Sequence, residues 1–205
     1  MTRRIGVVAS IAVVVMSAAY GITLAGGLRS LASPQDAIGD PWFSILELQI
    51  LLLAPLMVFV MAAIHDWVGP EGKTTSLVAL VFTSLLAGLT CSVHFVILAV
   101  GGPLHVTFAW PSIPYALDIL AWDGFFGIAM LFAAAAFHGD RLRVAIRVLA
   151  TLSGTLALAG FVGVATGELQ LRMIGVVGYA VVYPVVIALV AVVLRRRASP
   201  DATGR

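Results

Sequence analysis

Cysteine is almost missing from this chain, because Cys91 is the one cysteine among 205 residues. A single thiol excludes an intramolecular disulfide and a cysteine-based metal site. Charged residues are also scarce, at 11% of the chain, whereas hydrophobic residues make up 61%. A soluble domain of this length could not bury so much apolar surface, so lipid must cover the excess.

The sequence also lacks the short motifs of several common chemistries. It has no glycine-rich phosphate loop, no His-Glu-x-x-His metal motif and no Gly-x-Ser-x-Gly elbow. No run of lysine and arginine is interleaved with aromatic residues, and the net charge is only +2. Hydrolase and nucleotide-binding functions therefore have no support. We expect no nucleic-acid partner, no metal ion and no other cofactor.

What the chain does contain is six apolar stretches of about 20 residues or more, the length that crosses a bilayer. They cover about 5–28, 42–64, 75–101, 115–138, 146–166 and 170–194. We therefore predict an all-α polytopic membrane protein, a bundle of six transmembrane helices that forms a single domain over residues 1–197. Residues 198–205 are predicted to form a short disordered cytoplasmic tail.

Lysine and arginine fall mainly on one side of these spans. The links between spans, taken alternately, place ten of the twelve basic residues on one side and only Arg29 and Arg172 on the other. The positive-inside rule then puts both termini in the cytoplasm of a multi-pass protein in a cell membrane, such as a bacterial inner membrane. We expect an uncleaved first span and basic clusters that touch anionic lipid head groups.

Ionisable and phenolic side chains gather at one depth of the predicted bundle. At 1.5 Å per residue, they lie within roughly 14 Å of the non-cytoplasmic end of their spans. They come from five spans and comprise Tyr20, Glu47, His94, Asp118, Asp123, Arg172 and Tyr179. An ionisable group at membrane depth costs at least ~2.5 kcal/mol. We therefore predict that these groups satisfy one another around a pocket that opens toward the outer leaflet.

Helical phase supports this convergence in the third and sixth spans. Thr90 and His94 share one face of the third span, and Arg172 and Tyr179 share one face of the sixth. The fifth span instead carries a stripe of small residues that favours close helix packing: Ser153, Ala157, Gly160 and Gly167.

The fourth span divides its acids between two directions. Asp118, Trp122 and Phe125 share a face, whereas Asp123 points about 140° away from Asp118 in a straight α-helix. The two aspartates therefore cannot aim at the same point. We expect one of them to line the pocket and the other to bind a neighbouring helix or the interface.

The predicted site gives each of these residues a role. Asp123 is the acid or proton carrier, Glu47 is its partner, and His94 orients the acid or receives the proton. The predicted substrate-binding residues are Asp118, Trp122, Phe125, Arg172, Tyr179, Tyr20 and Thr90. Arg172 would hold a polar or anionic head group, although pairing with Glu168 or extension to the interface fits equally well.

Several of these residues also fit ordinary structural roles. Asp118 suits an acid near a helix N-terminus, and His94 suits a histidine bonded to a backbone carbonyl. Aromatic residues near the same membrane surface, Trp42, Trp110 and Tyr115, are assigned to the interfacial belt. The apolar loop 105–115 is expected to lie on the membrane and to cover the site.

Glu47 and Asp123 lie among Trp122, Phe125 and Phe126 in a short chain with several spans. This pattern resembles the small integral-membrane terpene cyclases over most of the chain, without a specific shared motif. The resemblance implies isomerisation or proton-initiated cyclisation of an isoprenoid, with aromatic rings shielding a cation from water. The first hypothesis is therefore a membrane-embedded acid–base enzyme that acts on a lipid-like or isoprenoid substrate.

Three other functions stay open from the sequence. A proton-coupled transporter would use the two prolines inside spans, Pro55 and Pro184, as hinges. A lipid-binding protein would use the same pocket without turnover. A b-type haem protein would use His65 and His138, which end spans two and four at the same boundary. Membrane lipid and an apolar small molecule are the expected partners, while the substrate and the oligomeric state stay open.

Overall fold

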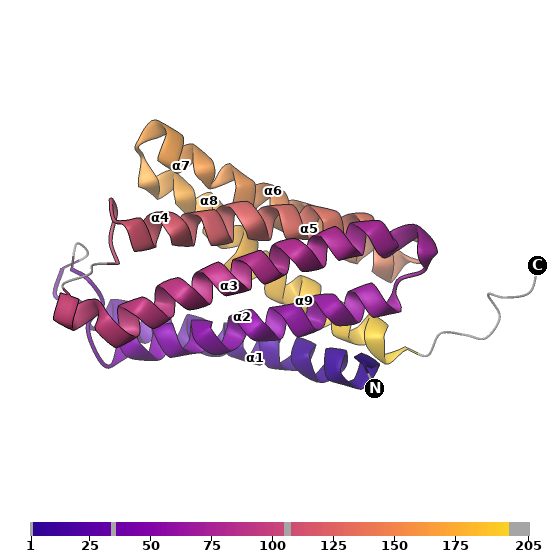
Figure 1. The fold of residues 1–205 in the computed structure, drawn as a ribbon, viewed down its shortest axis with the longest axis horizontal. Helices are drawn as coiled ribbons and strands as arrows, with labels where there is room; N and C mark the ends of the chain where they lie inside the picture. Colours follow the sequence, from indigo (N-terminus) through magenta and orange to yellow (C-terminus); the bar gives the residue numbers. More distant parts are fainter. Residues whose placement is uncertain (1, 34–35, 105–107, 197–205) are drawn as a thin grey trace, which may run out of the picture.

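The computed structural model describes residues 2–33, 36–104 and 108–196, and the regular structure in these ranges is entirely helical (Figure 1). Six helical segments in them are long and apolar enough to cross a membrane, which confirms the predicted number of spans. The predicted tail, residues 198–205, lies outside the described ranges. The single-domain assignment and the side of the membrane that each end faces stay predictions.

The first three spans are continuous helices, whereas the last three are built from shorter segments. The first three are α1 (Thr2–Arg29), α2 (Trp42–Trp67) and α3 (Lys73–Leu104), with the short 3-10 turn η1 (Pro70–Gly72) before α3. The fourth span joins α4 (Ile113–Ile119), η2 (Leu120–Phe125) and α5 (Phe126–Ala135). The fifth joins α6 (Arg141–Ala159) and α7 (Phe161–Thr166). The sixth joins η3 (Leu169–Arg172), α8 (Met173–Val176), η4 (Val177–Val182) and α9 (Tyr183–Arg195).

Local sequence explains where the site-bearing segments begin. The Ser112 hydroxyl accepts a hydrogen bond from the Tyr115 backbone N–H at 3.3 Å and so caps the start of α4. Asp140 caps α6 in the same way, accepting from the Arg143 N–H at 3.0 Å. At the other end of this span, Gly167 ends α7 with a backbone φ of +75°, a conformation that glycine adopts without strain. These signals fix the ends of the segments but leave their interiors to packing.

Packing between neighbouring helices closes the bundle. Helix α1 lies against both α2 and α9, α2 lies against α3, and α5 lies between α3 and α6. The Arg3 side chain donates to the backbone carbonyls of Leu194 and Arg195, so the start of α1 and the end of α9 lie side by side at one end of the bundle (Figure 1). We call this the basic end, because it carries Arg3, Lys73, Arg143 and Arg195.

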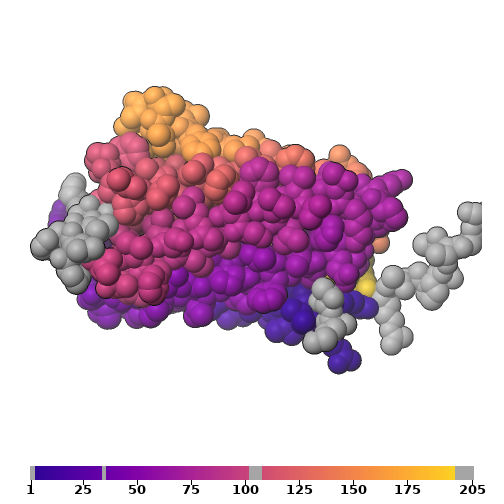
Figure 2. Space-filling model, in the orientation of Figure 1, coloured from indigo at the N-terminus to yellow at the C-terminus, as the bar shows by residue number. Residues whose placement is uncertain are grey.

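The outside of the bundle is rich in apolar side chains. Figure 2 shows α3 as a continuous wall of the molecule, and the turn between α7 and η3 projects beyond the body at the end opposite the basic end. Large apolar residues such as Leu52, Phe59, Val81 and Leu85 are exposed on α2 and α3. Such a surface suits contact with lipid tails, whereas a soluble protein would expose it to water.

Candidate functional site

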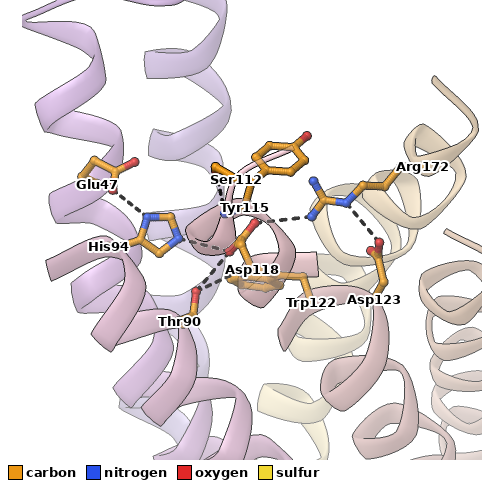
Figure 3. Close-up of polar contacts among 9 residues, drawn as sticks. All are labelled: Glu47, Thr90, His94, Ser112, Tyr115, Asp118, Trp122, Asp123 and Arg172. Atoms are coloured by element: carbon orange, nitrogen blue, oxygen red, sulfur yellow. Dashed lines mark hydrogen bonds and ion pairs between the residues drawn. The ribbon is translucent and has the colours of Figure 1, made fainter. Parts of the chain in front are cut away.

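Five ionisable side chains form one continuous line of contacts (Figure 3). His94 on α3 places its Nδ1 2.7 Å from Glu47 Oε2 on α2 and its Nε2 3.3 Å from Asp118 Oδ1 on α4. Arg172 of η3 donates from Nη2 to Asp118 Oδ2 at 3.4 Å and from Nε to Asp123 Oδ2 at 3.0 Å. We call the line Glu47–His94–Asp118–Arg172–Asp123 the charge chain.

The charge chain is buried and has more acids than bases. Its members range from 0% exposed at Asp123 to 8% at Arg172. Three carboxyl groups face one guanidinium and one imidazole, so a fully ionised chain with a protonated imidazole carries a net charge of −1. Buried net charge is costly, and titratable groups avoid it by taking up a proton. With three carboxylates, one guanidinium and a neutral imidazole, the net charge is −2. The charge chain therefore becomes neutral when its carboxyl and imidazole groups take up two protons from that state.

Asp118 lies at the centre of the polar contacts. Its Oδ1, which faces His94, also accepts a hydrogen bond from Thr90 Oγ1 at 3.5 Å. Thr90 Oγ1 in turn accepts a hydrogen bond from Trp122 Nε1 at 3.1 Å. Asp118 is the sixth residue of α4, and two basic side chains contact it. Proximity to a helix N-terminus, the structural role that the sequence suggested, therefore does not account for it.

The prediction that Asp118 and Asp123 cannot aim at one point was wrong. Segment η2 is π-helical, and in a π-helix backbone hydrogen bonds join residues five apart. Asp118 and Asp123 are five residues apart, so this segment brings them closer in direction than a straight α-helix does. Both contact Arg172 as a result.

The predicted pairing of Glu47 with Asp123 was also wrong. Three other members of the charge chain lie between them, and the direct partner of Glu47 is His94. Of the roles left open for Arg172, pairing with Glu168 is not what the structure shows, because its ion pairs are with the two aspartates and Glu168 is exposed. The two basic side chains thus alternate with the three acids. Binding of a head group stays a prediction.

Aromatic rings cover the charge chain, and sequence reasoning missed the most important of them. The His94 ring lies 5.4 Å from Phe108, which lies 5.3 Å from Tyr115, and the Arg172 guanidinium stacks 5.0 Å over the Tyr115 ring. Tyr115 was assigned to the interfacial belt. Its position three residues before Asp118, and so on the same face of α4, is the signal that would have found it. The expected cover by loop 105–115 includes residues 105–107, which lie outside the described ranges.

The remaining predicted binding residues divide into two groups. Trp122 joins the site through Thr90, and its ring lies 5.2 Å from that of Tyr179. Tyr20 on α1 lies within electrostatic range of Asp118 and Glu47. The ring of Phe125 instead lies 6.0 Å from Phe82 on α3, so the contacts described for it do not join it to the charge chain.

Glycines leave the room that Asp123 needs. A Cβ added at Gly160 would lie 2.9 Å from Asp123 Cγ, and one at Gly175 would lie 2.8 Å from Asp123 Oδ1. The small-residue stripe of the fifth span therefore forms a wall of the site, with Ser153 Oγ donating to the Gly178 carbonyl at 2.8 Å. Asp123 Oδ1 itself has no hydrogen-bond partner among the described residues.

A cavity lies at the basic end, away from the layer where we predicted a pocket. Its volume is about 550 Å³, and His138 is one of its lining residues. His65 is not among them, and its Nδ1 lies 2.9 Å from Ser76 Oγ. The two histidines of the haem hypothesis therefore do not face a common space. Across the described ranges, no three His, Cys, Asp or Glu side chains meet as a metal site.

Comparisons with family models, with curated proteins and with solved structures found no match for this chain. The class that the fold defines is a helical protein with six helices able to span a membrane and a buried charge chain at one end. The resemblance to membrane terpene cyclases stays a hypothesis, and any function must be argued from the residues of this chain.

Proposed function

We propose that the charge chain is the acid–base centre of a membrane-embedded enzyme that acts on a lipid-like substrate, with isoprenoids as the favoured class. The observation that carries the proposal is the excess of buried acids over bases in one connected line. Such a line holds exchangeable protons in a low-dielectric setting, which is what general acid–base catalysis requires.

The two ends of the charge chain suit different proton-transfer roles. Asp123 has one oxygen paired with Arg172 and one without a partner, so its free Oδ1 is the natural position for a transferable proton. At the other end, Glu47 and His94 form a carboxylate–imidazole pair that can take up a proton. In an isomerisation, the acid would protonate one carbon of a double bond and the base would remove a proton from another carbon. The acid is then deprotonated and the base protonated, so the enzyme regains its starting state only after the base has released a proton to solvent and the acid has taken one up.

The aromatic cover indicates the route of a substrate. Phe108 and Tyr115 lie over His94 and Arg172, so a substrate would have to displace or pass beside them. Their rings, with Trp122 and Tyr179 below, would also stabilise a cationic intermediate through their faces. A transporter is supported less well, because the charge chain comes from one level of four spans, and among the described residues the ion pair at the basic end, Arg143 with Asp140, is exposed and not buried.

Solvent deuterium gives a test that does not require the substrate to be known. The purified protein is incubated in D₂O with vesicles of a bacterial lipid extract that contains added polyprenols, and the lipids are analysed by mass spectrometry. Protonation at carbon predicts product lipids that carry deuterium from the solvent. Glu47→Gln and Asp123→Asn should each lower the incorporation about a hundredfold or more. Glu168→Gln, which removes an exposed acid outside the charge chain, should leave it unchanged.

Three outcomes contradict the proposal. If the lipids gain no deuterium with the wild-type protein, the site does not turn over such lipids. A lipid that co-purifies with the protein and carries no deuterium would then indicate binding without turnover. If Glu47→Gln and Asp123→Asn both retain full incorporation, the chemistry lies elsewhere. If Glu168→Gln is as inactive as they are, loss of charge at this end of the bundle explains the effect.

A further inference from the structure

The cavity at the basic end has no role in the proposed chemistry, because it lies at the far end of the bundle. Its walls come from the end of α2, the turn η1, the link between α5 and α6, and the end of α9. At about 550 Å³ it falls within the size range of small-molecule sites. The cavity therefore needs an explanation of its own.

Cationic groups are among the residues that line this cavity. Arg143 of α6 and Arg196, which follows α9, are both lining residues. The Arg143 guanidinium lies 5.0 Å over the Trp67 ring, and its Nη1 donates to the His138 carbonyl at 3.3 Å. These contacts hold the guanidinium at the cavity while leaving it partly exposed, with 42% of the side chain accessible.

His138 adds a further donor. Its Nδ1 lies 3.3 Å from Arg147 Nη1, and arginine can only donate, so Nδ1 is the acceptor. In a neutral imidazole the hydrogen is then on Nε2, which becomes a donor. Arg147 thus orients His138 through this hydrogen bond. It does not line the cavity itself, but its guanidinium contacts a residue that does.

Two acids also line the cavity, and one of them is already engaged. Asp140 accepts the Arg143 N–H at 3.0 Å as the cap of α6, and this hydrogen bond lowers the pKa of Asp140 and keeps it ionised. Its other oxygen lies 3.8 Å from Arg143 Nε. Glu71 is the second acid. The lining itself thus has two arginines and two acids, and a further positive charge comes from Arg147, which contacts the lining residue His138.

Apolar groups line the same cavity. Val68, Ala136 and Val193 are lining residues together with Trp67. A cavity that combines arginines with apolar side chains, at the end of a membrane bundle, matches a lipid whose phosphate meets the arginines and whose first acyl carbons meet the apolar side chains. We infer that the cavity binds the head group of an anionic phospholipid through Arg143, Arg196 and His138.

Native mass spectrometry of the purified full-length protein tests this inference. The protein in detergent is titrated with phosphatidylglycerol and with phosphatidylcholine of the same acyl chains, and with inorganic phosphate in a separate arm. We expect phosphatidylglycerol to bind more tightly than phosphatidylcholine. Arg143→Gln and Arg196→Gln should each weaken its binding about fivefold. Arg141→Gln removes the same charge from the same end but not from the cavity lining, and should have little effect.

The outcomes separate the possible explanations. Equal affinity for the two lipids, or unchanged binding in both cavity variants, would overturn the inference. An equal loss in Arg141→Gln would show that the overall charge of this end attracts the lipid, and that result also overturns it. Tight binding of free phosphate without a preference between lipids would assign the cavity to a soluble anion instead. Gel filtration and thermal unfolding of each variant show whether it folds, and Glu168→Gln, which removes an exposed acid outside both sites, should bind the lipid like wild type.

Discussion

Asp118 and Asp123 hold one guanidinium between them, although in a straight α-helix they would point in different directions. Arg172 lies 3.4 Å from Asp118 and 3.0 Å from Asp123, measured between the nearest nitrogen and oxygen atoms. The π-helical segment η2 makes this possible, and π segments occur often at functional sites. Arg172 thereby joins the fourth span to the sixth at the level of the charge chain.

Replacing Arg172 by glutamine should strongly destabilise the protein. The change leaves the buried Asp123 without its cation and Asp118 with His94 as its one basic contact, and breaking a buried pair in this way typically costs about 3–5 kcal/mol. For a chain of this length, we expect the melting temperature in detergent to fall by roughly 6–20 °C. Adding Asp123→Asn to the same variant should recover part of the loss, because the unpaired acid is then removed.

Arg29→Gln is the matched control for this experiment. Arg29 ends α1 and is exposed, at the same end of the bundle as Arg172. An exposed arginine contributes little, so the melting temperature should change by no more than about 2 °C. Equal melting temperatures for Arg172→Gln and Arg29→Gln would show that the buried ion pairs do not form.

Much of the fold was predictable because the length and hydropathy of the spans are strong signals. The meeting of His94 with Glu47 was also predictable in outline, since isolated ionisable groups at that depth are costly. The order of contacts was not predictable, because it depends on the π-helical segment η2. The residues Leu120–Phe125 taken alone do not require the wider π-helical turn. In the folded protein, this turn occurs where Asp123 packs against Gly160 and Gly175.

The cavity shows the opposite limit of sequence reasoning. Polar residues gathered in one layer suggested a pocket there, and in the structure these side chains pair directly with one another. The cavity instead forms where short turns such as η1 leave the ends of α2 and α9 uncovered. From the sequence, Arg143 was only a member of a basic cluster and His138 only a candidate haem ligand, because the sequence does not show which helix ends face one another.

Gly175→Ala should destabilise the protein, although alanine normally favours helices. The added methyl group would lie 2.8 Å from Asp123 Oδ1 and 3.2 Å from the Ala157 carbonyl, so the carboxyl group or the helix must move. Such overpacking typically costs about 1–3 kcal/mol. Thermal unfolding in detergent measures the effect, and the same variant should lose deuterium incorporation if Asp123 is the acid.

Gly88→Ala on α3 is the control, because a Cβ at this position meets nothing within 4 Å. Replacing a helical glycine by alanine at an open position stabilises the helix by about 0.5–1 kcal/mol. The two variants should therefore shift the melting temperature in opposite directions. A shift in the same direction for both would mean that the space beside Asp123 is not as tight as the contacts indicate.

The orientation of the bundle can be read from two single cysteines in a Cys91→Ala background. Gly39 lies before α2 at the end opposite the basic end, and Gly69 lies in the turn before α3 at the basic end. A side chain at either position meets nothing within 4 Å, so neither Gly39→Cys nor Gly69→Cys should disturb the fold. Because the basic end is predicted to be cytoplasmic, a membrane-impermeant maleimide should label Gly39→Cys in intact cells. It should label Gly69→Cys only after permeabilisation. The reverse pattern would place the charge chain toward the cytoplasm, and equal labelling of both in intact cells would mean that the chain does not hold one orientation.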